Sequence, residues 1–437
     1  MNIHSILSAA LAGTLLFAAS THAAEPEHCH SGAYRFTDGG QMLVQPSDED
    51  NLRYRWLDGA TGKLFPTGPH RYESGPGWSG REPVSLTVEF GECDTGTVVY
   101  APVDGTAREG RRIALPTVPI TFENDGASLY GELVLPEQSA PKALVVLQYG
   151  GGRDSAVLNN YVQYLLPLSD IAVFLYDKRG TGRSGGQFNL HIGMQADDLV
   201  AALAAARRDP RVAGIPVGLM GESQGGWVAP LAATTAPVDF VVASYGLAVS
   251  MQEEDRLEVE QQLRSRGHGP EALAKGLEMH RIALRVAISR FTEGVEEWMQ
   301  ARNDHAGEAW FQDIGGDITS TLMLTPEEQL PAIRAFLDVP YDLEYDPLPT
   351  LRSLGIPQLW LLAEDDTEAP IETTLARLQM LAREGRPIDT IVFPQADHGM
   401  IAIEPGSERR LAGRTAPGYF ERLSAWILRQ ARVTARE

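Results

Sequence analysis

The apolar positions follow two different patterns along the chain, and the pattern changes near residue 115. Before that point the apolar runs are short, and glycine turns such as Asp58-Gly59 and Asp104-Gly105 separate them. Short alternating runs of this kind predict β-strands over residues 41–44, 52–56, 84–90 and 98–100. We therefore expect residues 24–115 to form a small all-β domain.

From about Pro119 onward, apolar runs alternate with stretches of helical periodicity. Several of these runs are continuous in Val, Leu and Ile, which is typical of strands buried on both faces of a sheet. The alternation predicts an α/β fold with a mostly parallel sheet and crossover helices, formed by residues 116–250 and 347–437. The expected strands are 129–135, 143–148, 171–177, 217–221, 240–244, 358–363 and 390–393, and the expected helices include 194–208, 368–385 and 416–432.

A stretch rich in Glu, Arg, Leu and Ala interrupts this alternation between residues 251 and 346. Its apolar positions recur mostly at intervals of three and four, as in Leu273, Leu277 and Leu284, which indicates amphipathic helices. We expect residues 251–346 to be a helical unit inserted into the α/β domain.

The first long apolar run lies at the start of the chain. Residues 6–19 are apolar or small, about 14 positions in all, and a short run of mostly small residues follows up to Ala23. This length is below the roughly 20 residues that a helix needs to span a bilayer. We expect residues 1–23 to be a cleavable signal peptide, so that the mature chain is secreted or periplasmic and has no membrane span. The alternative is a retained membrane anchor.

Export changes the interpretation of the two cysteines, Cys29 and Cys93, which both lie in the expected β domain. In an oxidising compartment a disulfide is the leading hypothesis. The disulfide would close a loop of some 65 residues and stabilise the β domain by roughly 4 kcal/mol. The alternatives are two free thiols, or a metal site on His28-Cys29-His30. No second ligand pair stands at a matching spacing for a metal.

Composition narrows the possible partners. The chain has 58 acidic and 37 basic side chains, a formal net charge of -21, and 43% hydrophobic residues. Such a chain can bury a full core, while its charge disfavours binding to nucleic acid or to anionic lipid.

The strongest chemical motif is Gly221-Glu222-Ser223-Gln224-Gly225, which follows an apolar strand and precedes a helical stretch. A serine at a sharp strand-to-helix turn is exposed at the sheet edge, and glycines are needed where a Cβ would collide with neighbouring backbone. Ser223 is therefore the candidate nucleophile. The backbone N–H of Gln224, at the first helical turn, is a candidate oxyanion donor.

A serine nucleophile needs a base and an acid that orients the base. His398 follows the last expected strand, at the edge of the sheet where active sites of such folds form. The strand at 358–363 is followed by four acids, of which spacing favours Asp366, with Asp365 as the alternative. The chain order serine, aspartate, histidine is one of the known orders for such a triad.

Residues from about Pro119 to Glu437 resemble the α/β-hydrolase superfamily, and within it the branch of serine aminopeptidase-like and dienelactone hydrolase-like esterases. Residues 147–152, Leu-Gln-Tyr-Gly-Gly-Gly, are similar to the family's oxyanion loop, which implies that Gly151 supplies the second oxyanion N–H. The turn Asp-Lys-Arg-Gly-Thr-Gly at 177–182 also resembles the family, which implies a structural role for Arg179. Glu222 stands where many members carry histidine, and we expect its carboxylate to be solvated.

We expect a serine hydrolase that cleaves carboxylic esters of small molecules through an acyl-enzyme, without a metal or organic cofactor. Ser223 and Asp366 are 143 positions apart, far more than two strands and two helices need. We therefore expect the helical unit, inserted after strand 6 of such a fold at the carboxyl end of the sheet, to form a cap over the site. One alternative is a serine peptidase, aminopeptidase-like, that acts on short peptides. The other is a catalytically silent binding protein that uses the β domain.

Overall fold

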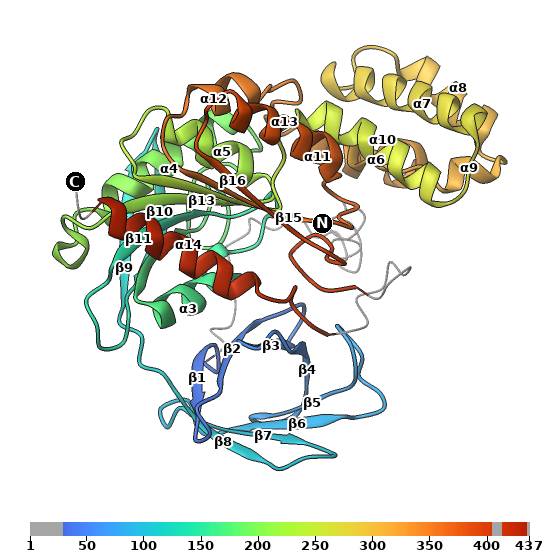
Figure 1. Ribbon diagram of the computed structural model, residues 1–437. Helices are drawn as coiled ribbons and strands as arrows, with labels where there is room; N and C mark the ends of the chain where they lie inside the picture. The colour runs from blue at the N-terminus through green and yellow to red at the C-terminus, as the bar shows by residue number, and fades with distance from the viewer. Residues whose placement is uncertain (1–28, 404–412, 435–437) are drawn as a thin grey trace.

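The computed structural model describes residues 29–403 and 413–434. The signal peptide expected at residues 1–23 lies outside the described residues. The described part consists of a β-barrel, a large mixed sheet with helices on both faces, and a separate group of helices that lies beside one end of the sheet (Figure 1).

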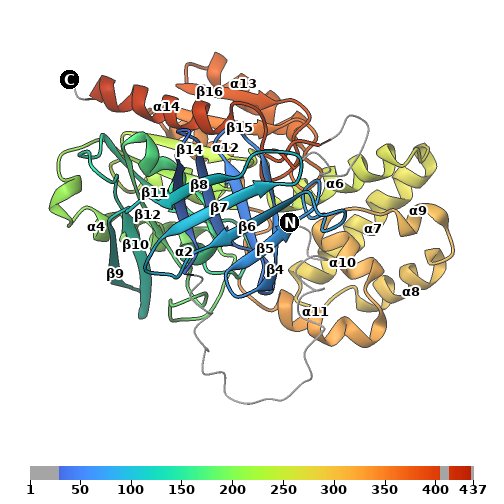
Figure 2. The same cartoon turned by 90° about the horizontal axis from the view of Figure 1, so that it is seen from below.

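The predicted all-β region closes into an eight-stranded antiparallel barrel (Figure 2). Closure is made by the pairing of the first and last strands, in which Tyr34 stands opposite Arg112. Its interior is filled by buried aromatic and aliphatic side chains, among them Tyr34, Phe36 and Trp56. The strands are β1 (Gly32–Phe36), β2 (Gln41–Pro46), β3 (Leu52–Trp56), β4 (Thr61–Gly68), β5 (Arg71–Ser74), β6 (Leu86–Phe90), β7 (Thr97–Pro102) and β8 (Arg108–Arg112).

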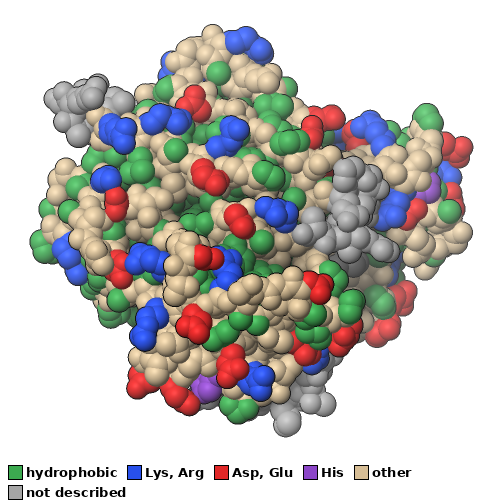
Figure 3. Space-filling view, turned by 60° about the horizontal axis from the view of Figure 1, so that its bottom comes forward, with side chains coloured by type: hydrophobic (Ala, Val, Ile, Leu, Met, Phe, Trp, Pro, Cys, Tyr) green, Lys and Arg blue, Asp and Glu red, His purple; other side chains and the backbone are tan. Residues whose placement is uncertain are grey.

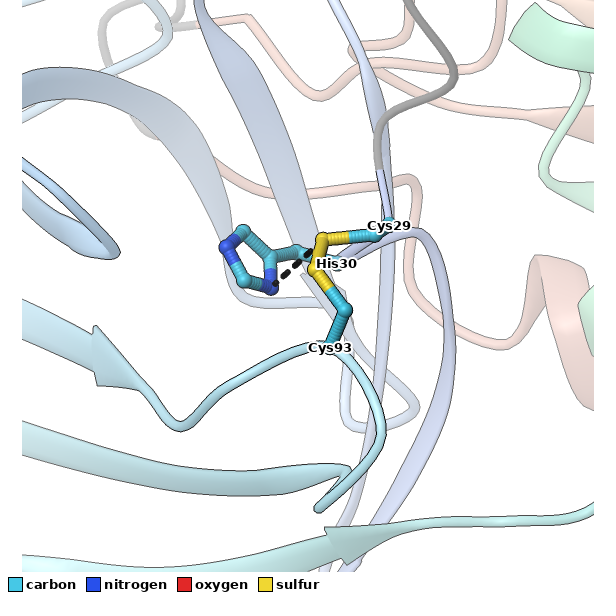
Figure 4. Close-up of side chains that lie close together, drawn as sticks. All are labelled: Cys29, His30 and Cys93. Carbon is cyan, nitrogen blue, oxygen red and sulfur yellow. Dashed lines mark hydrogen bonds between the residues drawn. A yellow bond between two sulfur atoms is a disulfide. The ribbon is translucent and has the colours of Figure 1, made fainter.

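The disulfide predicted between Cys29 and Cys93 is present, and it joins the segment just before β1 to the loop between β6 and β7 (Figure 4). The two Cα atoms are 5.5 Å apart. The Nδ1 atom of His30 lies 3.8 Å from the sulfur of Cys29. Because both sulfurs are bonded to each other, neither is a thiolate, and the metal site considered at His28-Cys29-His30 loses its sulfur ligand.

The second sheet has eight strands in the order β16-β15-β14-β13-β11-β12-β10-β9. The six strands from β11 onward are parallel, and β10 pairs antiparallel with both β12 and β9. The strands are β9 (Thr117–Asn124), β10 (Ala127–Val134), β11 (Ala143–Gln148), β12 (Ile171–Tyr176), β13 (Val217–Glu222), β14 (Phe240–Ser244), β15 (Gln358–Ala363) and β16 (Ile388–Phe393). The expectation of a mostly parallel sheet is met, and β9 was not predicted.

Helices cover both faces of this sheet, and the barrel lies below one of them. On that face, Leu43 of the barrel joins a buried cluster with residues of α3 (Val162–Leu165) and α14 (Tyr419–Thr434). On the other face lie α4 (Ile192–Ala206) and α5 (Gly225–Ala233), with α12 (Leu348–Ser353) and α13 (Ile371–Arg383) against β15. Three short helices complete this part: α2 (Ala156–Asn159), η1 (Leu166–Ser169) and η2 (Pro210–Val212).

The chain between β14 and β15 is helical, as predicted, and this helical segment has a hydrophobic core of its own. Trp298, Trp310 and Phe311 are buried in that core. The helices are α6 (Met251–Ser265), α7 (Pro270–Ile288), α8 (Val295–His305), α9 (Ala309–Gln312), α10 (Asp317–Leu324), η3 (Glu327–Gln329) and α11 (Leu330–Leu337).

The surface mixes charges of both signs on the face that has the barrel toward the viewer. Figure 3 shows Lys and Arg side chains interspersed with Asp and Glu side chains across this face. The net charge of -21 is therefore not gathered into one acidic patch there.

We predict that replacing both cysteines, in the variant C29S/C93S, lowers the free energy of unfolding of the barrel by about 4 kcal/mol, because the disulfide closes a long loop. The sequence separation that it closes is 64 residues. Hydrogen exchange of the β1 and β8 amides measures the loss, and the amides of β13 serve as an internal control. Unchanged exchange in β1 and β8 would contradict the prediction.

Candidate active site

Ser223 lies at the sharp turn between β13 and α5, with a left-handed φ of 52° that non-glycine residues seldom adopt. Its backbone N–H donates to the carbonyl of Ser244 at 3.0 Å, which ties the turn to the end of β14. A Cβ on Gly221 would lie 1.9 Å from the carbonyl oxygen of Gly225, so the strand and helix meet too closely for any side chain there. The glycines predicted to be required at this turn are therefore required by backbone contact.

His398 reaches Ser223 from the loop that follows β16. Its Nε2 atom is 3.0 Å from the Ser223 hydroxyl, across 175 positions of sequence. Its Nδ1 atom is 2.9 Å from Oδ2 of Asp366. Because a carboxylate can only accept, Nδ1 carries the proton in this arrangement, and Nε2 is left to accept from the serine hydroxyl.

Asp366 follows β15 and is 1% exposed. Its second oxygen, Oδ1, accepts the backbone N–H groups of Glu368 at 3.0 Å and Ala369 at 2.8 Å. Asp365, the other acid that the sequence left open, is exposed. Of the two acids, the structure brings Asp366 to the histidine.

The two expected oxyanion donors lie beside the nucleophile. Gly151 and Gln224 line the same pocket as Ser223 and His398, and a Cβ built on Gly151 would lie 3.7 Å from the side-chain oxygen of Gln224. Gln224 stands at the N-terminal end of α5, where backbone N–H groups lack helical partners. Gly151 and Gln224 therefore lie close together in the pocket wall.

Lys178, a residue that sequence reasoning did not single out, contacts the expected oxyanion loop. Its ammonium is buried and donates to the carbonyl of Gly150, and burial lowers the pKa of this lysine to about 7.

Arg179, for which the resemblance implied a structural role, pairs with Asp198 of α4 at 2.7 Å. Its guanidinium also donates to the backbone carbonyls of Asn124 and Asp125.

Glu222 corrects an expectation, since its carboxylate was expected to be solvated and is only 2% exposed. It accepts a hydrogen bond of 2.5 Å from the side chain of Asn160, and burial raises its pKa to about 7. The residue is the last of β13, and the segment that follows α2 covers it on the barrel side.

The ring of Tyr245 meets the His398 ring edge-on, with the centroids 4.9 Å apart.

A pocket of about 160 Å³ opens beside Ser223. The sheet domain contributes its catalytic candidates and the helical segment contributes most of the remaining wall, including Met251, Leu337 and Leu343. The acids in this wall were not predicted, because acids on an amphipathic helix have the same sequence pattern whether they face solvent or a pocket. They are Glu254, Asp255, Glu258 and Asp317, with Glu368 beside them.

Comparison with known proteins finds similarity in the part of the chain that holds the serine elbow and the expected oxyanion loop. A family model described as serine aminopeptidase, S33, matches residues 139–263. Monoglyceride lipase from Homo sapiens is 29% identical over 137 residues, which is 30% of this chain and 43% of that protein. The chain thus matches less than half the length of that relative.

Two solved structures show the extent of the similarity in fold. An acylaminoacyl peptidase from Pyrococcus horikoshii has a TM-score of 0.45 at 13% identity, covering 89% of this chain and 55% of that chain. An esterase from Pyrococcus furiosus has a TM-score of 0.44 at 14% identity, covering 74% of this chain and 91% of that chain. The match to the serine aminopeptidase family model spans the serine elbow between β13 and α5, so this part of the chain is similar to that family of α/β hydrolases.

Proposed function

We propose that the protein is a serine hydrolase that cleaves carboxylic esters of small molecules through an acyl-enzyme. The observation that carries the proposal is the pair of hydrogen bonds that links Ser223 to His398 and His398 to Asp366. These bonds stand at the wall of a pocket, so a bound carbonyl can reach the serine.

In the proposed mechanism Ser223 attacks the ester carbonyl while His398 accepts its proton at Nε2. Asp366 stabilises the imidazolium that forms and keeps the ring in place. The N–H groups of Gly151 and Gln224 donate to the oxyanion of the tetrahedral intermediate. His398 then returns the proton to the leaving alcohol, and a water molecule, activated by the same histidine, cleaves the acyl-enzyme. Every step uses groups of this chain and water.

We propose that the helical segment acts as a cap over this site. Its residues form much of the pocket wall, and the pocket is small compared with the several hundred Å³ that drug-sized ligands occupy. The proposed division is a β domain at 24–115, a catalytic domain at 116–250 and 347–437, and a cap at 251–346. A cap in this position restricts the size of the groups that can reach Ser223.

We also propose that the protein is exported. The disulfide supports this, because disulfides form and persist in oxidising compartments. Among the residues at 29–403 and 413–434, no helix is both long and apolar enough to cross a membrane.

A peptidase is the second candidate. The same serine, histidine and aspartate can cleave an amide, and an aminopeptidase needs a carboxylate for the free amine of its substrate. The acids in the pocket wall favour this alternative over the catalytically silent protein.

We expect the Ser223→Ala variant to lose about a millionfold in turnover of p-nitrophenyl acetate, since no other group replaces the nucleophile. Steady-state kinetics on the purified protein measure the loss. Ser353→Ala, which alters an exposed serine on α12, is the matched control and keeps wild-type turnover. Retention of most of the activity in Ser223→Ala would refute the proposed nucleophile.

Asp366→Asn and Asp365→Asn separate the two adjacent acids. The first removes the acceptor of His398 and is expected to lower kcat by about ten-thousandfold, because the histidine then takes the wrong tautomer. The second alters an exposed side chain and is expected to leave kcat within about twofold. A large loss in Asp365→Asn with none in Asp366→Asn would reverse the assignment.

A parallel assay of p-nitrophenyl esters and aminoacyl p-nitroanilides distinguishes the esterase from the peptidase. We expect turnover of the esters, with kcat/KM highest for acyl chains of about two to four carbons, because the pocket is small. Turnover of the anilides with kcat/KM above that of every ester would favour the peptidase.

A further inference from the structure

Lys178 differs from the other lysines of the chain. Of the 37 basic side chains that are Lys or Arg, four are lysines. Lys63, Lys142 and Lys275 each form an ion pair with a carboxylate. Lys178 is 4% exposed and forms an ion pair with no carboxylate of residues 29–403 and 413–434. A buried ammonium without a counter-charge is costly, and charges of this kind gather at functional sites.

The group that accepts from this ammonium lies against the nucleophile. Lys178 donates to the carbonyl of Gly150, and a Cβ built on Gly150 would be 3.2 Å from the Cβ of Ser223. The backbone of the lysine is held as well, because the N–H and the hydroxyl of Thr181 both donate to the Lys178 carbonyl at 2.9 Å. The lysine therefore links the turn after β12 to the expected oxyanion loop.

The carbonyl of Gly150 belongs to the same peptide unit as the N–H of Gly151, which is the proposed oxyanion donor. Such a unit is planar, and this one is trans. In a trans unit the C=O and the N–H point in opposite directions. A bond that holds the carbonyl toward Lys178 thus also fixes the direction of the Gly151 N–H.

The charge of this donor matters in addition to its position. A cation at the carbonyl oxygen draws electrons from the conjugated peptide unit, which makes the N–H of that unit more positive. Hydrogen bonds with an ionised partner are roughly twice as strong as those between neutral groups. A more positive N–H stabilises a full oxyanion more than it stabilises the neutral carbonyl of bound substrate, and this difference is what accelerates a reaction.

The surroundings of the ammonium decide when it is charged. The ring of Phe188 lies beside it, with the ring centre 5.3 Å from Nζ. Among the described residues, the charged side chains that act on it are Asp154, which favours the ammonium, and Arg153, which disfavours it. Burial is the largest influence and lowers the pKa of Lys178 to about 7, so the charge is present below neutral pH and is lost above it.

We propose that Lys178 is a positioning residue for the oxyanion hole, which acts through the peptide unit of Gly150 and Gly151 and strengthens the Gly151 N–H as a donor. The inference rests on the proposed function, because an oxyanion forms only if Ser223 attacks a carbonyl. Lys178 contacts neither the substrate nor the reacting atoms in this assignment. Its loss therefore weakens the binding of the transition state and leaves the binding of substrate nearly unchanged.

The turnover of p-nitrophenyl acetate by the wild-type protein and by Lys178→Met, measured from about pH 6 to about pH 8.5, tests the proposal. Methionine is of similar length and has neither a donor nor a charge. The readout is the ratio of the two kcat values at each pH, because the titration of His398 is common to both proteins. We expect a ratio of about tenfold near pH 6, less than the effect of deleting a donor, and a decrease by about threefold or more toward pH 8.5.

Trifluoroacetone gives a second measurement, because it adds to the serine and places an oxyanion where the tetrahedral intermediate has one. Near pH 6 its Ki is expected to rise about tenfold in Lys178→Met, while KM for the ester stays within about twofold. Lys178→Gln replaces Lys178→Met should the latter fail to fold, with the same expected change of the kcat ratio with pH. Lys142→Met is the matched control, since it removes an exposed lysine just before β11, and it keeps wild-type kcat and Ki.

The outcomes separate this inference from the function on which it rests. A kcat ratio near one, a ratio that does not change with pH, or an unchanged Ki would overturn the role of Lys178, even with Ser223→Ala inactive. Wild-type turnover in Ser223→Ala would instead refute the proposed function.

Discussion

The contact between the end of β13 and the start of α5 is the constraint on which the site depends. Strand and helix approach so closely that a Cβ on Gly221 would lie 1.9 Å from the carbonyl oxygen of Gly225, and a Cβ on Gly225 would lie 2.6 Å from the carbonyl oxygen of Gln148 at the end of β11. Ser223 is held in a strained left-handed conformation between them, and the bond from its N–H to Ser244 keeps the turn in register with β14. The sheet thereby fixes the serine hydroxyl, and the loops after β15 and β16 bring Asp366 and His398 to it.

The barrel contacts two segments that lie next to this arrangement. The side chain of Gln45 donates to the backbone of Asn159 at 2.6 Å, and the Arg55 guanidinium lies 4.4 Å from the centre of the Tyr161 ring. Between these two contacts stands Asn160, which donates to the buried Glu222 next to the nucleophile. The barrel also bonds to the loop beyond His398, where the N–H of Thr61 donates to the carbonyl of Gly413 at 2.7 Å. A domain without an evident chemical motif thus contacts the segment that donates to Glu222 and the loop that follows His398.

Local sequence signals account for what could be predicted. The buried parallel strands were found because their apolar runs are continuous, and Ser223 and His398 were found because each follows such a strand. The edge strand β9 was missed because its outer positions are polar and Phe122 is its one buried residue. The solvation expected for Glu222 was wrong, because its burial depends on a segment that folds over it from 62 positions away. The pocket acids could not be found, since Glu254 and Glu258 lie in the same acidic run as Glu253 and Glu260, and only packing separates their surroundings.

The central claim is that Ser223 is activated as a nucleophile by His398. Peptide mapping after reaction with a fluorophosphonate tests it most directly, because this reagent bonds only to a serine that is already activated. We expect stoichiometric labelling of the peptide that contains Ser223 in the wild-type protein, and its loss in His398→Ala. Labelling of a different serine, no labelling of the folded protein, or full labelling in His398→Ala would contradict the account.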